Sequence, residues 1–195
     1  MKIYFTASIY QSNNFGENYK LINSTLKNLG YDVISDHIIG VELNEISTGA
    51  EEDRRAFYKK VVKWIKDCNI LVAEVSFPSS VNIGHEITLG LENEKPVLAL
   101  YQKGFNPIFL EGNTNEKFIL IEYDPTNPKE LERIIKSSLK KLIKATDIRF
   151  NFFISPEIVR YLDWVAKVKR VPRSVYLRDL IEDDMKKHKD YGTQG

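Results

Sequence analysis

Short apolar runs alternate along the chain with longer segments whose apolar residues recur at helical spacing. The runs at 2–5, 31–34, 71–75, 97–100 and 117–123 are typical of strands, and the third is apolar enough to be buried on both faces of a sheet. The segments at 19–29, 51–66, 84–94 and 128–144 have the spacing of amphipathic helices. Alternating strands and helices predict an α/β fold with a doubly wound, parallel, five-stranded sheet.

Two connections between these elements are polar and contain turn-forming residues. Residues 7–18 and 76–83 are expected to be loops, and the second one leads into a helix that opens at Gly84. A sheet with this order is of the flavodoxin-like or Rossmann-like type, in which ligands bind outside the carboxyl ends of the strands. Both loops follow strands, so both are expected at a binding edge.

The pattern changes near Ala145. A short strand is expected at 149–154, followed by a helix that begins at Pro156 and a second helix capped by Ser174. The sequence therefore predicts a domain over 1–145, a small β-α-α domain over 146–190 and a tail over 191–195. So small a domain cannot bury much apolar surface alone, and we expect it to dimerise or to pack on the main domain.

Composition and motifs limit the cellular location and the kinds of site that we expect. The 195 residues have a net charge of +1 and a single cysteine, Cys68, which excludes a disulfide framework. No apolar run is as long as a membrane span, and no signal-peptide pattern follows Met1, so a cytoplasmic protein without a membrane partner is expected. The sequence has neither metal-ligand spacing nor a glycine-rich phosphate loop, so we expect no metal and no cofactor.

Glu86 is the leading candidate for chemistry. It is expected in the first turn of the helix after the 76–83 loop, where the helix dipole favours an ionised carboxylate that could act as a nucleophile. The alternative is a glutamate that only stabilises its helix. His37 follows the strand at 31–34 and is either a binding residue or a solvated loop histidine.

Three stretches resemble the nucleoside 2-deoxyribosyltransferase superfamily, which includes the deoxynucleoside 5′-monophosphate N-glycosidases. They are Ile3-Tyr4-Phe5-Thr6-Ala7-Ser8-Ile9, then Asp36-His37 with Val41-Glu42-Leu43, and Ala73-Glu74-Val75-Ser76-Phe77-Pro78-Ser79 with Gly84-His85-Glu86-Ile87. The resemblance covers about the first 145 residues in the right order. It implies cleavage or transfer at the N-glycosidic bond of a nucleoside or nucleotide substrate.

The resemblance also implies roles for single residues. Glu86 would be the nucleophile that forms a glycosyl ester, and Tyr4 would lie against it. The remaining implied contacts are with the substrate: His37 near the base, and Ser8, Ile9, Ser79 and Gly84 near the sugar or its 5′ end.

The chain departs from the superfamily pattern at four places, one of which is an extra residue in the signature loop at 79–83. The superfamily has an aspartate that protonates the leaving base or positions the sugar, and Val61 aligns with it here. An arginine of the glycosidases aligns with Tyr10. A loop that brings serine and arginine to the phosphate of a neighbouring subunit aligns here with Pro107 and Glu111.

Residues 148–189 resemble a ribbon-helix-helix domain. That resemblance implies a homodimer in which outward ribbon residues, here Arg149 and Asn151, read DNA and Ser174 contacts a phosphate. The charge of this segment argues against DNA binding. From Asp147 onward it has 10 Lys and Arg and 8 Asp and Glu, and this small positive excess would neutralise few phosphates.

Three hypotheses follow from these patterns. The first is an N-glycosidase or deoxyribosyltransferase that assembles as a homodimer or larger homo-oligomer. The second is a nucleotide-sensing, DNA-binding regulator built on a degenerate enzyme domain. The third is a scaffold whose C-terminal domain only closes an oligomer.

Overall fold

The computed structural model describes residues 1–39, 51–145 and 153–188. The chain divides into two compact units, Met1–Asp147 and Ile148–Gly195. Each unit is described by itself. Among the described helices, none combines the length and apolar character that crossing a membrane requires.

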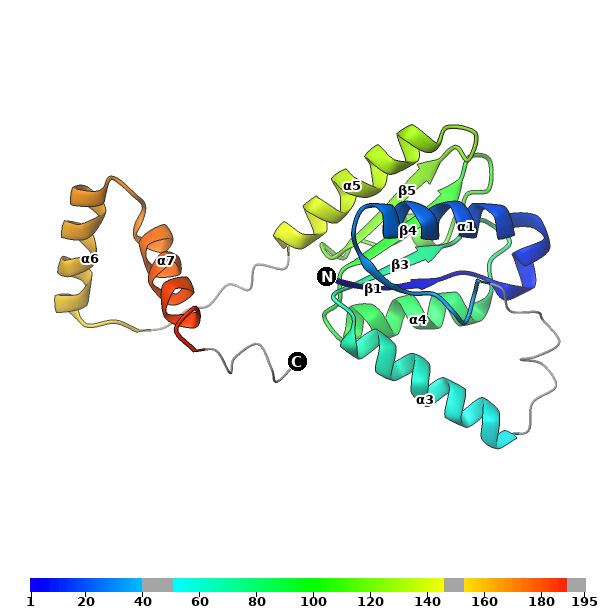
Figure 1. The fold of residues 1–195 in the computed structure, drawn as a ribbon, viewed down its shortest axis with the longest axis horizontal. Coiled ribbons are helices and arrows are strands. Elements are labelled where there is room, and N and C mark those ends of the chain that lie inside the picture. Colours follow the sequence, from blue (N-terminus) through cyan, green and yellow to red (C-terminus); the bar gives the residue numbers. More distant parts are fainter. Residues whose placement is uncertain (40–50, 146–152, 189–195) are drawn as a thin grey trace. The chain divides into compact units, whose positions relative to one another are not determined.

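A five-stranded sheet forms the centre of the first unit (Figure 1). Every neighbouring pair of strands is parallel, in the order β2-β1-β3-β4-β5. The prediction of a parallel, five-stranded α/β sheet is therefore confirmed. The strands are β1 (Lys2–Thr6), β2 (Asp32–Ile34), β3 (Ile70–Glu74), β4 (Val97–Gln102) and β5 (Phe118–Tyr123).

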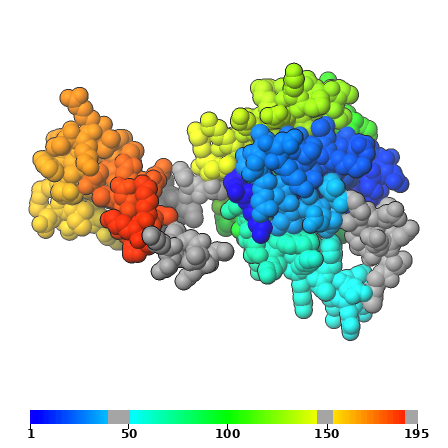
Figure 2. All heavy atoms as spheres, viewed as in Figure 1, coloured from blue at the N-terminus to red at the C-terminus, as the bar shows by residue number. Residues whose placement is uncertain are grey.

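Helices cover both faces of this sheet. On one face, Ile3 and Phe5 of β1 share a core with the helices α1 (Ser12–Asn28) and α5 (Pro128–Ala145). On the other face, Tyr4 shares a core with α3 (Glu51–Asp67) and α4 (Val81–Glu92). This alternation follows from the two-residue period of a strand. Figure 2 shows the side chains of α1 and α5 covering the first face.

Two helices begin earlier than the sequence pattern predicts. Helix α1 begins at Ser12, so residues 12–18 are helical rather than a loop. The polar and glycine residues of this stretch hide its buried Phe15 from a search for periodicity. Helix α4 begins at Val81, so Gly84 is its fourth residue and does not open it.

The second unit contains two helices, α6 (Pro156–Lys169) and α7 (Arg173–Met185). Ser155 caps α6, because its Oγ accepts a hydrogen bond from the backbone N–H of Ile158 at 3.3 Å. The expected cap of α7 was wrong: Pro172 is the N-cap residue, and Ser174 is the second residue of the helix. Proline has no side-chain acceptor, and α7 begins without a side-chain cap.

The predicted ribbon strand at 149–154 lies mostly outside the described residues. Its last two positions, Phe153 and Ile154, are described and are not in a strand. The buried core of this unit consists of Leu162, Val165 and Tyr176. Three large apolar residues of α7 are exposed: Leu180, Ile181 and Met185.

Candidate active site

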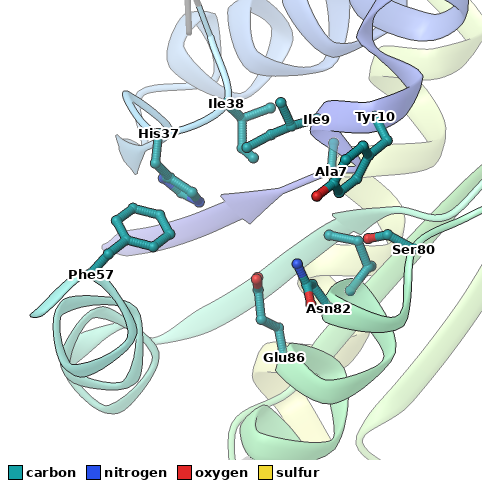
Figure 3. A pocket seen from close by; sticks show the side chains of 10 residues that line it. Ala7, Ile9, Tyr10, His37, Ile38, Phe57, Ser80, Asn82 and Glu86 are labelled. Atoms are coloured by element: carbon teal, nitrogen blue, oxygen red, sulfur yellow. The ribbon is translucent and has the colours of Figure 1, made fainter. Parts of the chain in front are cut away.

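A cavity lies where the strand order reverses, beside the carboxyl ends of β1 and β3. Strand β1 has β2 on one side and β3 on the other, and such a reversal opens a crevice in a parallel sheet. The cavity encloses about 540 Å³ of empty space, part of it open to solvent. It is lined by Ala7, Ile9, Tyr10, His37, Ile38, Phe57, Ser80, Asn82, Ile83 and Glu86 (Figure 3).

Glu86 reaches the cavity from α4 and is hydrogen-bonded to β1. The Tyr4 hydroxyl donates to Glu86 Oε2 at 3.0 Å. Burial raises the pKa of Glu86, while the hydroxyl groups of Thr6 and Tyr4 and the nearby His85 favour its charged form and oppose the shift. Burial and the neighbouring Glu86 also raise the pKa of Tyr4, so the phenol stays protonated and acts as the donor.

The position of Glu86 in its helix differs from the prediction. Because α4 begins at Val81, Glu86 is the sixth residue of the helix and lies outside the first turn. The effect of the helix dipole falls off within one turn, so the dipole is a weaker influence than the sequence suggested. Hydrogen bonding from Tyr4 is the clearer source of stabilisation for the carboxylate.

His37 is buried against aromatic rings. Its imidazole stacks on Tyr4 with ring centroids 5.0 Å apart and lies 5.1 Å from the centroid of Trp64. Burial lowers the pKa of His37 to about 4; nearby Asp36 opposes this shift, and Lys60 adds to it. Neither ring nitrogen has a hydrogen-bond partner within the described part of the chain. His37 is thus a neutral imidazole with unused polar atoms at the wall of the cavity, not a solvated loop histidine.

The short 3₁₀ helix η1 (Ile9–Gln11) brings Ile9 and Tyr10 to the cavity. The preceding residue, Ser8, is buried, and its carbonyl oxygen accepts a hydrogen bond from the Tyr19 hydroxyl at 3.1 Å. Tyr19 belongs to α1, so this bond ties the cavity-lining turn to the helix behind it.

Two predicted substrate residues lie elsewhere. Ser79 and Gly84 line a neighbouring apolar cavity with Phe77, Ile108 and Phe109. Ser80 lines both cavities. A side chain added at Gly84 would meet nothing within 4 Å, so close approach to neighbouring protein atoms does not require glycine at this position.

Several residues that line the cavity are not evident as site residues from the sequence. Asn82 lies four residues before Glu86, and this helical spacing could have placed both on one face. Phe57 of α3 packs against the core and also lines the cavity. Val61, one turn further along α3, is 4% exposed and lies in the core.

Only one of the three residues implied in DNA contact is described by the structure. Arg149 and Asn151 lie outside the described residues, and Ser174 is exposed on α7 of the second unit. Within the described ranges, no three His, Cys, Asp or Glu side chains form a group that could hold a metal ion.

Sequence and structure comparisons identify relatives of the first unit. No model of a known protein family matches the chain. The "Putative 2'-deoxynucleoside 5'-phosphate N-hydrolase 1" of Syntrophotalea carbinolica is 34% identical over 140 residues, which span 71% of this chain and 94% of that protein. The 5-hydroxymethyl-dUMP N-hydrolase of Tetraodon nigroviridis is 24% identical over 127 residues, which span 63% of this chain and 88% of that protein.

Among solved structures, a 2-deoxyribosyltransferase from Bacillus psychrosaccharolyticus has a TM-score of 0.50 at 18% identity, covering 68% of this chain and 90% of that one. At this identity the likeness supports the fold alone. The relationship to the Syntrophotalea protein is closer and spans nearly all of that protein. The chain therefore belongs to the family of 2′-deoxynucleoside 5′-phosphate N-hydrolases.

Proposed function

We propose that this protein hydrolyses the N-glycosidic bond of a 2′-deoxynucleoside or its 5′-monophosphate, with Glu86 as the nucleophile. The observation that carries the proposal is the hydrogen bond between Tyr4 and Glu86 at the wall of a cavity at the switch point of the sheet. The names of the related proteins supply the reaction and the class of substrate.

The proposed reaction has two steps. The Glu86 carboxylate attacks C1′ of the sugar, the C1′–N bond breaks, and its electron pair leaves with the base. Water then attacks C1′, the ester bond breaks, and Glu86 is released as a carboxylate. The proton that water loses balances the one that the base gains. If a second base replaces water, the same intermediate gives transfer instead of hydrolysis.

Tyr4 would orient the nucleophile in this reaction. Its hydroxyl donates to Oε2 of Glu86, which favours the charged form of a carboxylate that burial otherwise disfavours. The proposed nucleophile and the residue that orients it are thus one hydrogen-bonded pair from α4 and β1.

His37 is the residue we propose to hydrogen-bond the base. It is neutral near pH 7 because burial lowers its pKa to about 4, so one ring nitrogen can donate and the other can accept. Val61 occupies the aligned position of the superfamily aspartate and cannot transfer a proton, so the contact that we propose for the departing base is a hydrogen bond with the neutral His37 imidazole.

The test compares the wild type with Glu86→Gln and Glu86→Ala. Each protein is incubated with a panel of deoxynucleosides and their 5′-monophosphates, and then released base and intact protein mass are measured. We expect base release only from the wild type, and a sugar-mass adduct that maps to Glu86. Base release by Glu86→Ala at the wild-type rate would overturn the assignment of the nucleophile.

For the second unit we propose pairing with another copy of the chain. The support is the set of large apolar side chains that α6 and α7 leave exposed, among them Trp164, Ile181 and Val168. The regulator hypothesis depends on Arg149 and Asn151 for reading DNA, and no described contact favours it.

A further inference from the structure

Asn82 is a polar residue of the cavity to which the proposed function gives no role. Figure 3 shows His37 at one end of the cavity, and Tyr10 and Ser80 at the other. Asn82 lies between these ends, beside Glu86. The two residues are four positions apart on α4, so their Cβ atoms lie about 5–6 Å apart on one face of the helix.

The side-chain amide of Asn82 is available to a ligand. Asn82 is exposed and lines the cavity, and within the described part of the chain no hydrogen bond engages its amide oxygen or nitrogen. An amide offers an acceptor oxygen and two donor hydrogens, and it carries no charge. This combination suits a hydroxyl group, which can both donate and accept a hydrogen bond.

The stereochemistry of the substrate determines which hydroxyl group can reach this amide. In a 2′-deoxynucleoside the base and C5′ project from one face of the sugar ring, and the 3′-hydroxyl projects from the other face. A nucleophile that displaces the base attacks C1′ from the face opposite the base. The 3′-hydroxyl is therefore on the same side of the bound sugar as Glu86, which is the side that faces α4.

The two ends of the cavity determine the direction of the sugar along α4. With the base at His37 and C1′ at Glu86, the C4′ side of the ring points toward Ser80. C3′ adjoins C4′, so the 3′-hydroxyl lies over α4 between Glu86 and Ser80. Asn82 lines the cavity at that place. Tyr10 comes from η1, across the cavity from α4, and so faces C5′ instead.

We propose that Asn82 binds the 3′-hydroxyl group of the substrate and makes the site selective for sugars that carry this group. The proposal rests on the function proposed above and adds a specificity-determining residue to it. A 2′,3′-dideoxynucleotide lacks the hydroxyl group and therefore loses the contact.

Binding tests this contact without turnover. Carbocyclic 2′-deoxynucleoside 5′-monophosphates have a methylene group in place of the ring oxygen that supports cleavage, and their 2′,3′-dideoxy counterparts also lack the 3′-hydroxyl. Dissociation constants for these matched pairs, one pair for each DNA base, are measured by calorimetry on the full-length wild type and Asn82→Ala. We expect the wild type to bind the analogue with the 3′-hydroxyl about three- to tenfold more tightly, and Asn82→Ala to bind both analogues with similar affinity.

Ser80→Ala is the matched control. It removes a hydroxyl group from the same cavity and the N-cap of the same helix, where the Ser80 side chain makes no capping hydrogen bond. We expect this variant to keep the wild-type ratio of the two dissociation constants, even if both constants change. An unchanged ratio in Asn82→Ala, an equal fall of the ratio in both variants, or a wild type that binds neither analogue would overturn the proposal.

Cleavage of the natural substrates separates this proposal from the proposed function. Selective binding without release of base from any substrate would refute the hydrolase and leave the contact with Asn82 standing. Release of base by a wild type that binds the two analogues equally would support the hydrolase and refute the contact.

Discussion

Glu86 and Tyr4 share a hydrogen bond in surroundings that disfavour charge on either. Burial raises the pKa of both groups, and the Tyr4 hydroxyl opposes that shift for the carboxylate. A nucleophile must be ionised to attack, so kcat/KM should increase with pH through a limb above the ordinary carboxyl range. Below that limb the protonated acid is inactive.

Tyr4→Phe should move this limb to higher pH. Losing a hydrogen bond to a charged group costs about 1.5–3 kcal/mol, which corresponds to an upward shift of about one pKa unit or more for Glu86. The measurement is kcat/KM from pH 4 to 9 for both proteins. A limb at the same pH in Tyr4→Phe, with only a lower plateau, would contradict the role given to the phenol.

His37→Phe should change how stability depends on pH. In the folded protein burial lowers the pKa of His37 to about 4, so between pH 4 and about 6.5 the unfolded chain binds more protons. The free energy of unfolding therefore falls as pH drops through this range, by about 2 kcal/mol at pH 5. Phenylalanine keeps the aromatic stack with Tyr4 and removes the titration.

Urea unfolding of wild type and His37→Phe at pH 7.5 and pH 5 checks this expectation. The variant should lose less stability than the wild type on acidification. His188→Phe, at an exposed histidine of the second unit, is the control and should follow the wild type. Parallel losses in the wild type and His37→Phe would show that His37 does not carry this part of the acid sensitivity.

Site residues could be predicted from the sequence where a reactive side chain directly follows a recognisable strand or loop. His37 and Glu86 follow a recognisable strand and loop and line one cavity, whereas Tyr4, which contacts both of them, was implied only by the family resemblance. Ser80 and Asn82 were not selected, because which loop side chain faces the cavity depends on where α4 begins. Phe57 lies on the apolar face of α3. The sequence pattern is the same whether such a residue packs in the core or lines a cavity.

At the scale of elements, the connection from β1 through η1 to α1 shapes one wall of the cavity. The Tyr19 hydroxyl donates to the carbonyl oxygen of Ser8, directly before the turn that carries Ile9 and Tyr10. Tyr19 does not itself line the cavity, so it is a positioning residue.

Tyr19→Phe should raise KM with little change in kcat. The loss of one buried hydrogen bond costs about 0.5–1.5 kcal/mol, or about two- to tenfold in KM if the turn loosens. Tyr123→Phe is the matched control, because this buried tyrosine donates to Glu74 at 3.1 Å instead of to the turn. Both variants should lower Tm, and only Tyr19→Phe should raise KM. A similar rise in KM for Tyr123→Phe would assign the effect to general loosening.

The elements themselves were largely predictable, because buried parallel strands and amphipathic helices leave strong patterns. All five strands and the helices α3 and α5 begin within about two residues of their expected positions. The errors fall at the starts of α1 and α4, where polar and small residues adopt helix. Phe15 and Ile83 pack against the sheet and so stabilise the first turns of α1 and α4. The amino-acid composition of these turns does not by itself indicate a helix.

At the scale of the whole molecule, the second unit has too small a core for its apolar content. Among the residues described in this unit, those buried in the core are Leu162, Val165 and Tyr176, whereas Trp164 and Ile181 are 60% and 61% exposed. A second copy of the same two helices would offer the same surface in return, as a symmetric pair requires.

Ile181→Asp should therefore weaken self-association of the full-length protein. An unpaired carboxylate buried in an apolar interface is strongly unfavourable, so we expect the dissociation constant to rise by about tenfold or more. Sedimentation equilibrium measures it, with Glu182→Lys at the neighbouring exposed position as the control. A monomeric wild type at micromolar concentration would contradict the pairing.

The hydrogen bond from Tyr4 to Glu86 joins residues that are 82 positions apart in the chain. During synthesis β1 is complete long before α4 leaves the ribosome, and β1 must first pair with β3 before its tyrosine can meet the glutamate. Contacts between residues so far apart in the sequence form late in folding. The chain must first lose the entropy of closing a large loop, before the contact can stabilise the fold. A nascent or truncated chain that ends before α4 thus carries the strand and turn of the cavity but lacks Glu86, so the cleavage proposed above requires the completed fold.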